Sequence, residues 1–323
     1  MHRLTRCLVV LFAVFAVLLP IPATADPGSV IVDVRPLGGR QFEVHVYSAA
    51  MNRTIPVWVS HPGHPAPALY LLNAVDGGET GGPWTNRTDV AHFFADKPVN
   101  VIQPIGGHAS YYSDWVADDP VLGRNKWSTF LIHELPPLLE NHFGMTGRNA
   151  VAGTSMSATS ALNLAIEAPG RYQAVGSYSG CPRTSDPMAR AYVHSQLRLF
   201  GANADNMWGG GDHPAWAAHD PVLNAERLRG VALYISSGNG AAGVHDTLTD
   251  PSIGGDAGRL ADRLLVGGGM ESVVRSCTNS LTDRLAALGI PATVVHRNGT
   301  HAWPYWQDDL HDSWPLFAAA LGV

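Results

Sequence analysis

Ser155 and the short motif around it are the part of the sequence that points most directly to chemistry. The motif reads G-T-S-M-S within Asn149–Leu162, between a short apolar run and a run of small residues that favours a helix. A strand, a sharp turn and a helix in this order are typical of a nucleophile elbow, whose general form is G-x-S-x-G. Ser157 stands at the second glycine position, and so small a side chain still allows the strand and the helix to approach closely. The motif predicts that Ser155 is a nucleophile.

A nucleophilic serine needs a base that accepts its proton and a carboxylate that orients the base. In the chain order of α/β-hydrolases the acid follows the nucleophile and the histidine comes last. His301 follows the last predicted strand and is therefore the candidate base. Spacing alone does not select the acid. Four carboxylates lie in the required interval: Asp246, Asp250, Asp256 and Glu271.

Backbone N–H groups near Ser155 would complete this chemistry, because a tetrahedral intermediate carries negative charge on oxygen. One donor is expected from Met156, directly after the nucleophile, and a second from the loop Asn73–Asp76, which follows an apolar strand. The glycines of Gly77–Gly82 lack the spacing of a phosphate-binding motif, and no cysteine–histidine cluster has metal-ligand spacing. We therefore expect neither a cofactor nor a metal.

Alternating strands and helices are predicted to position these residues. Short alternating runs predict antiparallel strands at Val30–Val34, Phe42–Tyr47 and Ile55–Val59. Continuous apolar runs predict buried parallel strands at Ala68–Leu72, Val99–Pro104, Ala174–Tyr178, Val231–Ser236 and Ala292–His296. Helices are expected at Asp89–Asp96, Thr129–Asn141, Ala158–Glu167, Ala257–Leu265, Glu271–Leu288 and Trp314–Leu321, with further helical turns in Thr184–Leu228. This alternation predicts one domain with a doubly wound, mostly parallel α/β sheet.

The start of the chain has the composition of a secretory signal peptide at residues 1–25, with a basic beginning, an apolar stretch and small residues before the cleavage site. We expect cleavage after Ala25, which leaves residues 26–323 as a domain in the medium or the cell envelope, without a transmembrane segment. The formal net charge of −6 and the lack of a Lys/Arg run argue against a nucleic-acid partner. An oxidising compartment favours a disulfide between Cys181 and Cys277.

Several further motifs occur together and in order along nearly all of residues 26–323. They are Met51–Ile55, Tyr70–Asn73, Lys126–Leu131, Glu134–Pro136, Glu271–Ser276 and Gly299–Trp306. With these motifs and the one around Ser155, the chain resembles the antigen 85 mycolyltransferases. These are secreted α/β-hydrolases that move a mycolyl group from one trehalose monomycolate to another, or to arabinogalactan, through an acyl-serine.

The resemblance implies roles that spacing leaves open. It favours Glu271 as the acid and the N–H of Val75 as the second oxyanion donor, and it implies that positions 73 and 76 line the sugar site. Asn73 stands where the family has Asp and Asp76 where it has Arg, so the resemblance does not fix the sugar. The family's cysteine pair is missing, which indicates a different bridge. Residues 90–95 replace its fibronectin-binding stretch, and we do not expect that binding here.

These observations predict an exported serine acyltransferase whose partner is an acylated trehalose or another glycolipid. Ser155, Glu271 and His301 would form its triad, and Trp115 and Trp303 either wall the cleft or belong to the core. Two alternatives remain. One is a secreted carboxylesterase that uses water as the acceptor, and the other is a cell-wall or matrix-binding protein without activity, against which the presence of all three triad residues argues.

Overall fold

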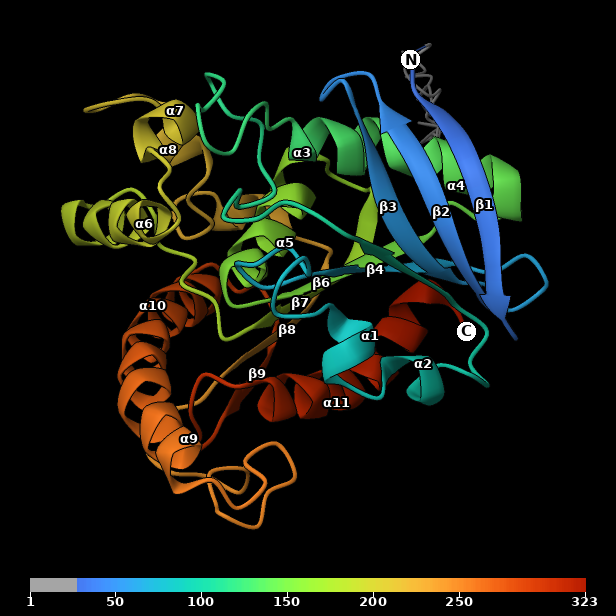
Figure 1. Cartoon of the computed structure of the whole chain (residues 1–323). Helices are drawn as coiled ribbons and strands as arrows, with labels where there is room; N and C mark the ends of the chain where they lie inside the picture. Colours follow the sequence, from blue (N-terminus) through green and yellow to red (C-terminus); the bar gives the residue numbers. More distant parts are fainter. Residues whose placement is uncertain (1–27) are drawn as a thin grey trace, which may run out of the picture.

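Three antiparallel strands open the described part of the chain, which covers residues 28–323 of a computed structural model (Figure 1). The predicted signal peptide at residues 1–25 lies outside the described residues. The strands are β1 (Val30–Gly38), β2 (Gln41–Ser48) and β3 (Arg53–Ser60). Val44 and Val46 on β2 are fully buried while the residues between and beside them are partly exposed, as expected for a strand with one face on the core. The predicted antiparallel strands are confirmed.

Six further strands continue the same sheet and pair with one another in parallel. They are β4 (Ala68–Leu72), β5 (Asn100–Pro104), β6 (Asn149–Thr154), β7 (Tyr172–Tyr178), β8 (Ala232–Ser237) and β9 (Thr293–His296). Within the described residues the strand order is β1-β2-β3-β5-β4-β6-β7-β8-β9. The chain leaves β4 toward β5 and leaves β6 toward β7, so the loops after these adjacent strands diverge. Open α/β sheets bind ligands in the crevice at such a point.

Helices cover both faces of the sheet, and the side chains of β4 are divided between two cores. Tyr70 and Leu72 pack into one core, and Leu69 and Leu71 into the other. One face carries α3 (Trp127–Thr129), a π-helical turn at Phe130–Glu134, α4 (Leu135–Phe143), α5 (Met156–Glu167) and α10 (Gly268–Ala287) (Figure 1). The opposite face carries α1 (Trp84–Arg87), α2 (Val90–Phe93) and α11 (Trp303–Leu321). Burial on both faces explains the continuous apolar runs.

A helical segment between β7 and β8 lies over the carboxyl end of the sheet. It contains α6 (Pro187–Leu199), α7 (Ala204–Trp208), α8 (Ala215–Ala218) and a 3-10 turn at Ala225–Leu228. Asp186 is the N-cap of α6, and its carboxylate accepts hydrogen bonds from the N–H groups of Met188 and Ala189. The helical turns predicted for this stretch are confirmed. None of the helices in residues 28–323 combines the length and the apolar character that a membrane span requires.

The predicted break between two helices before Glu271 is wrong. α9 (Ala257–Asp262), a π-helical turn at Arg263–Gly267 and α10 follow one another directly. Glycines weaken a helix, which is why the sequence predicts a gap here. A Cβ atom at Gly268 would lie 2.6 Å from the carbonyl oxygen of Gly240, so close packing requires glycine at this position within the helix.

The predicted start of the last helix at Trp314 is also wrong, because α11 begins at Trp303. Pro304 suits the first turn of a helix, where a missing N–H costs little. Pro315, which falls in the first turn of the predicted helix, lies inside α11, where a proline removes a helical hydrogen bond. The apolar face of α11 packs against the sheet, and this burial offsets the cost of the interior proline.

Candidate active site

Ser155 lies at the turn between β6 and α5 in the conformation of a nucleophile elbow. Its backbone has φ 57° and ψ −122°, which exposes the side chain above the sheet. A Cβ atom at Gly153 would lie 2.2 Å from the carbonyl oxygen of Ser157, so only glycine allows the strand and helix to approach this closely. The hydroxyl of Ser157 accepts a hydrogen bond from the N–H of Thr154 and lies 3.1 Å from the carbonyl oxygen of Leu72. Ser157 therefore fits the second glycine position by closing the turn with its own hydroxyl.

The three predicted triad side chains form one hydrogen-bonded chain. His301 Nε2 lies 2.8 Å from Ser155 Oγ, and His301 Nδ1 lies 2.6 Å from Glu271 Oε2. The three residues come from the β6–α5 turn, the loop after β9 and helix α10. The N–H of His301 also donates to the carbonyl oxygen of Gly267, which ties the histidine loop to the start of α10. This arrangement can remove a proton from the serine hydroxyl while the carboxylate holds the imidazole ring.

Glu271 is fully buried, and its two oxygens have separate partners. Oε2 faces His301, whereas Oε1 accepts hydrogen bonds from the hydroxyl of Ser179 at 2.7 Å and from the N–H of Gly238 at 2.6 Å. Burial alone raises the pKa of a carboxyl group, but these hydrogen bonds outweigh burial and hold the pKa of Glu271 below its ordinary value. Glu271 is therefore a carboxylate at neutral pH, as an orienting acid must be.

The other three candidate acids lie in supporting positions. Asp246 accepts hydrogen bonds from the side chains of Thr300 and Tyr305, which holds the loop before the histidine. Asp250 contacts His245, and Asp256 caps the N-terminus of α9. Glu271 is the member of this set whose carboxylate contacts His301, which spacing in the sequence could not decide.

Val75 and Met156 line the same small cavity as Ser155. Within the described residues neither amide has an acceptor among the backbone hydrogen bonds, so both are available to an oxyanion. Two backbone hydrogen bonds fix the loop that carries Val75. The carbonyl oxygen of Val75 accepts one from the N–H of Ala109, and the carbonyl oxygen of Gly77 accepts one from the N–H of Gly106. The role of these two amides as oxyanion donors stays a prediction.

Asn73 is buried, which corrects the expectation that this side chain lines the sugar site, and Trp115 belongs to the core, the second of its two predicted alternatives. Asn73 is 0% exposed, and its amide donates to the carbonyl oxygens of Gly77 and Pro104. An Asp could not make these two bonds, because an ionised carboxylate has no hydrogen to donate. Trp115 is 1% exposed and donates its indole N–H to the carbonyl oxygen of Ser110. Both side chains shape loops around the site.

Trp303 and Asp76 keep partly exposed positions near the site. Trp303 lines a cavity of about 660 Å³ together with His301, and its ring packs edge to face against Trp84 and Trp306. The carboxylate of Asp76 accepts hydrogen bonds from the N–H groups of Gly78 and Gly81. Both of its oxygens therefore have partners within its own loop. Contact of either residue with a substrate stays a prediction.

The disulfide and Ser179 lie in the same region, next to the three predicted triad residues. The predicted bridge between Cys181 and Cys277 is confirmed, with an S–S distance of 2.04 Å. Ser179, which holds Glu271, was not predicted. Its backbone φ of 52° and the hydrogen bond from its N–H to Ser236 depend on the packing of two strands, and no local pattern in the sequence signals them.

Known proteins match this chain over most of its length. The Esterase family model matches residues 48–317. The diacylglycerol acyltransferase/mycolyltransferase Ag85B of Mycobacterium intracellulare is 34% identical over 292 residues, which cover 87% of this chain and 83% of the relative. The corresponding Ag85A of Mycobacterium tuberculosis is 33% identical over 293 residues, covering 87% of this chain and 81% of the relative.

Solved structures support the fold. MPT51 (FbpC1) of Mycobacterium tuberculosis superposes with a TM-score of 0.68 at 23% identity, covering 85% of this chain and 96% of its own. An S-formylglutathione hydrolase from Agrobacterium tumefaciens gives 0.64 at 14% identity, covering 90% and 99%. The sheet, the elbow and these neighbours define an α/β-hydrolase fold. At the level of sequence, the chain belongs to the antigen 85 family.

Proposed function

We propose that this protein is a serine acyltransferase that moves a long acyl chain between trehalose esters, or onto a cell-wall sugar, through an acyl-serine. The observation that carries the proposal is the hydrogen-bonded chain from Glu271 through His301 to Ser155. The relatives named diacylglycerol acyltransferase/mycolyltransferase support the choice of an acyl donor. A mycolyl ester of trehalose is the donor to test first.

The first half-reaction forms the acyl-enzyme. Ser155 Oγ attacks the ester carbonyl carbon while His301 Nε2 accepts the hydroxyl proton. The carbonyl oxygen becomes an oxyanion, which the amides of Val75 and Met156 bind. The intermediate then collapses, the bond to the sugar oxygen breaks, and His301 returns the proton to that oxygen. Glu271 stabilises the imidazolium during this step because its charge lies next to Nδ1.

The second half-reaction transfers the acyl group to an acceptor. The acceptor hydroxyl gives its proton to His301 and attacks the acyl carbonyl, and the collapse of the second intermediate returns the proton to Ser155. The cavity beside His301 and Trp303 is a suitable acceptor site, since its volume of about 660 Å³ lies in the usual range for small-molecule sites. Arg87, Arg259 and Arg263 also line this cavity and offer hydrogen-bond donors to sugar oxygens.

The test of the proposal is acyl transfer by the purified protein. Incubation with trehalose monomycolate should give trehalose dimycolate, and Ser155→Ala should abolish this product while the circular dichroism spectrum stays that of the wild type. Transfer that persists in Ser155→Ala would remove Ser155 from the mechanism. The same variant should lose covalent labelling by a fluorophosphonate, and a wild-type protein that resists labelling would favour a binding protein without activity.

Hydrolysis is the second candidate function, and one observation favours it. The cavity that directly borders Ser155, Val75 and Met156 has a volume of only about 20 Å³, which accommodates a water molecule. Product analysis with acyl trehalose and excess free trehalose separates the two functions. Release of fatty acid without any diacylated sugar would identify an esterase, whereas diacyl trehalose would identify a transferase.

We also propose export of the protein to the medium or the cell envelope, where such glycolipids occur. The proposal rests on the composition of residues 1–25 and on the disulfide, which is favoured in oxidising compartments. N-terminal sequencing of the protein from culture medium should begin at Asp26. An intact residue 1 in extracellular material would argue against the predicted cleavage.

A further inference from the structure

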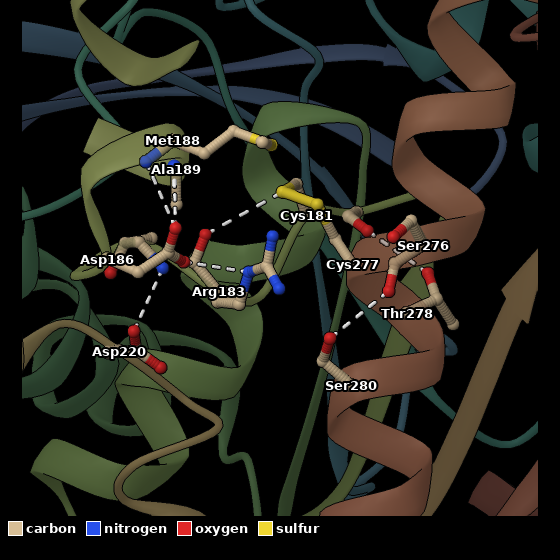
Figure 2. Close-up of a disulfide and its surroundings, with 12 residues drawn as sticks. Cys181, Arg183, Asp186, Met188, Ala189, Asp220, Ser276, Cys277, Thr278 and Ser280 are labelled. Carbon is tan, nitrogen blue, oxygen red and sulfur yellow. Dashed lines mark hydrogen bonds and ion pairs between the residues drawn. A yellow bond between two sulfur atoms is a disulfide. The ribbon is translucent and has the colours of Figure 1, made fainter. Parts of the chain in front are cut away.

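The segment directly after β7 is bonded to helix α10 at three consecutive residues. The hydroxyl of Ser179 donates to Glu271, the carbonyl oxygen of Gly180 accepts a hydrogen bond from the hydroxyl of Thr278, and Cys181 forms the disulfide with Cys277. Figure 2 shows the last of these links, with Cys277 and Thr278 side by side on the helix and Cys181 opposite them. We call Ser179–Cys181 and its three bonds the α10 clamp.

The α10 clamp lies between the helix that follows the nucleophile and the helix that carries the acid. A Cβ atom at Gly180 would lie 2.6 Å from the Cβ of Ala158 on α5, so the segment packs directly against that helix. On its other side the clamp contacts α10. Ser179 and Cys181 also border the small cavity at Ser155. The segment therefore lies between α5 and α10, and its packing sets the distance between Ser155 and Glu271.

Burial makes the loss of any of these bonds costly in free energy. Ser179 and Thr278 are each 1% exposed and Glu271 is 0% exposed, so water cannot replace a lost partner without a rearrangement. Glu271 Oε1 has two donors, and Ser179 is the one that belongs to the clamp. If the helix moves away from the segment, the Ser179 bond lengthens and the carboxylate gains freedom to turn away from His301.

We propose that the Cys181–Cys277 bridge is a positioning element of the active site, which acts by holding Ser179 in hydrogen-bond contact with Glu271. The inference rests on the proposed function, because it assigns Glu271 the role of orienting His301. Helix α10 is also held one turn after Glu271, because Arg275 donates to the carbonyl oxygens of Ser237 and Gly238. Loss of the bridge would then disturb the acid without releasing the helix.

Hydrolysis of p-nitrophenyl butyrate and labelling of Ser155 by a fluorophosphonate measure this effect without the natural substrate. Replacing both cysteines by serine should lower kcat and the labelling rate about tenfold, with KM changed less than twofold. The assays are run well below the melting temperature of the variant, because a bridge across 96 residues also stabilises the fold. Reduction and reoxidation of the wild-type protein should remove and restore the same activity.

A double-mutant cycle shows whether the bridge acts through Ser179. Ser179→Ala alone should lower kcat by a similar factor, and adding the two cysteine substitutions to Ser179→Ala should lower it by less than a further twofold. A bridge that only stabilises the fold leaves kcat of the folded variant unchanged, and a bridge that acts independently of Ser179 gives effects on kcat that multiply. Multiplying effects, or an unchanged kcat in the folded cysteine variant, would overturn the inference.

A second variant keeps the bridge in place. Thr278→Val removes the hydrogen bond to Gly180 and retains the shape of the side chain, and it should lower kcat about threefold. Thr282→Val is the matched control one turn further along α10, because its hydroxyl donates to the carbonyl oxygen of Asn279 on the same helix and, within the described residues, forms no hydrogen bond to the segment after β7. Equal activities of the two variants would count against the clamp. A wild-type protein that reacts with neither probe would overturn the proposed function and the inference with it, whereas a failure of mycolyl transfer alone leaves this test intact.

Discussion

The charge of Glu271 depends on the groups that surround its side chain. Its carboxylate is buried and ionised because three hydrogen-bond partners surround it, and one of them is the imidazole that it orients in the proposed mechanism. A buried group with fixed partners orients its neighbour without reorganising during the reaction. Its partners come from the segments after β7 and β8 and from the loop between β9 and α11, which explains why spacing alone left four candidate acids and only the resemblance favoured Glu271.

Glu271→Gln should lower kcat by about 10³- to 10⁴-fold, because the amide favours the wrong tautomer of His301 while it preserves the shape of the side chain. The measurement is kcat for p-nitrophenyl ester hydrolysis at neutral pH. Asp256→Asn is the control, since Asp256 was an equal candidate by spacing and an asparagine still caps α9. Comparable losses in both variants would contradict the assignment.

At the scale of elements, the long loop between β8 and α9 is fastened to α11 by a histidine between two carboxylates. His245 Nδ1 lies 2.9 Å from Asp250, and His245 Nε2 lies 2.7 Å from Asp308 on α11. Burial alone would lower the pKa of His245, but the hydrogen bonds to these carboxylates raise it above its ordinary value. The neighbouring guanidinium of Arg263 faces Asp250 at 4.0 Å. The contact therefore holds best when His245 is protonated.

The pH dependence of stability follows from this raised pKa. The contribution of His245 is fully present below the pKa of an unfolded histidine, about 6.5, and is lost as the pH rises through the higher folded value. The free energy of unfolding should therefore differ more between wild type and His245→Gln at about pH 5.5 than at about pH 9. Urea denaturation at both pH values measures the difference. A gap that widens with rising pH would contradict the sign.

At the scale of the whole molecule, one bridge joins parts of the chain that are far apart in sequence. The Cys181–Cys277 disulfide closes a loop of 96 residues that contains the covering helices, β8 and the start of α10. A cross-link of this span removes much of the freedom of the unfolded chain. Both ends lie at the carboxyl edge of the sheet, so the part of the fold that carries the site is also the part that the bridge restrains.

Removal of the bridge should lower the free energy of unfolding by about 4.7 kcal/mol, the size that the loss of loop-closure entropy predicts for a loop of this length. Urea denaturation of the wild-type protein with and without a reductant gives the value. The variant with both cysteines replaced by serine should unfold at the same urea concentration in either condition. A reductant effect in that variant would show that the shift has another origin.

The sequence by itself determined the features that depend on near neighbours along the chain. Alternating and continuous apolar runs gave the strands and the class of sheet, and the small residues around Ser155 gave the elbow, because tight strand–helix packing limits side-chain size locally. The boundaries of α10 and α11 were the exceptions, since packing against the sheet outweighed the local effect of Gly268 and Pro315.

Only the tertiary structure decided which distant side chains meet. It brings Glu271 rather than Asp246, Asp250 or Asp256 to His301, it buries Asn73 and Trp115 behind the loops they support, and it brings Ser179 to the acid. These outcomes depend on the register of neighbouring strands and on which face of α10 turns inward. The contacts of Glu271 with His301 and Ser179 join residues that lie 30 and 92 positions apart, and spacing along the chain does not decide which carboxylate makes them.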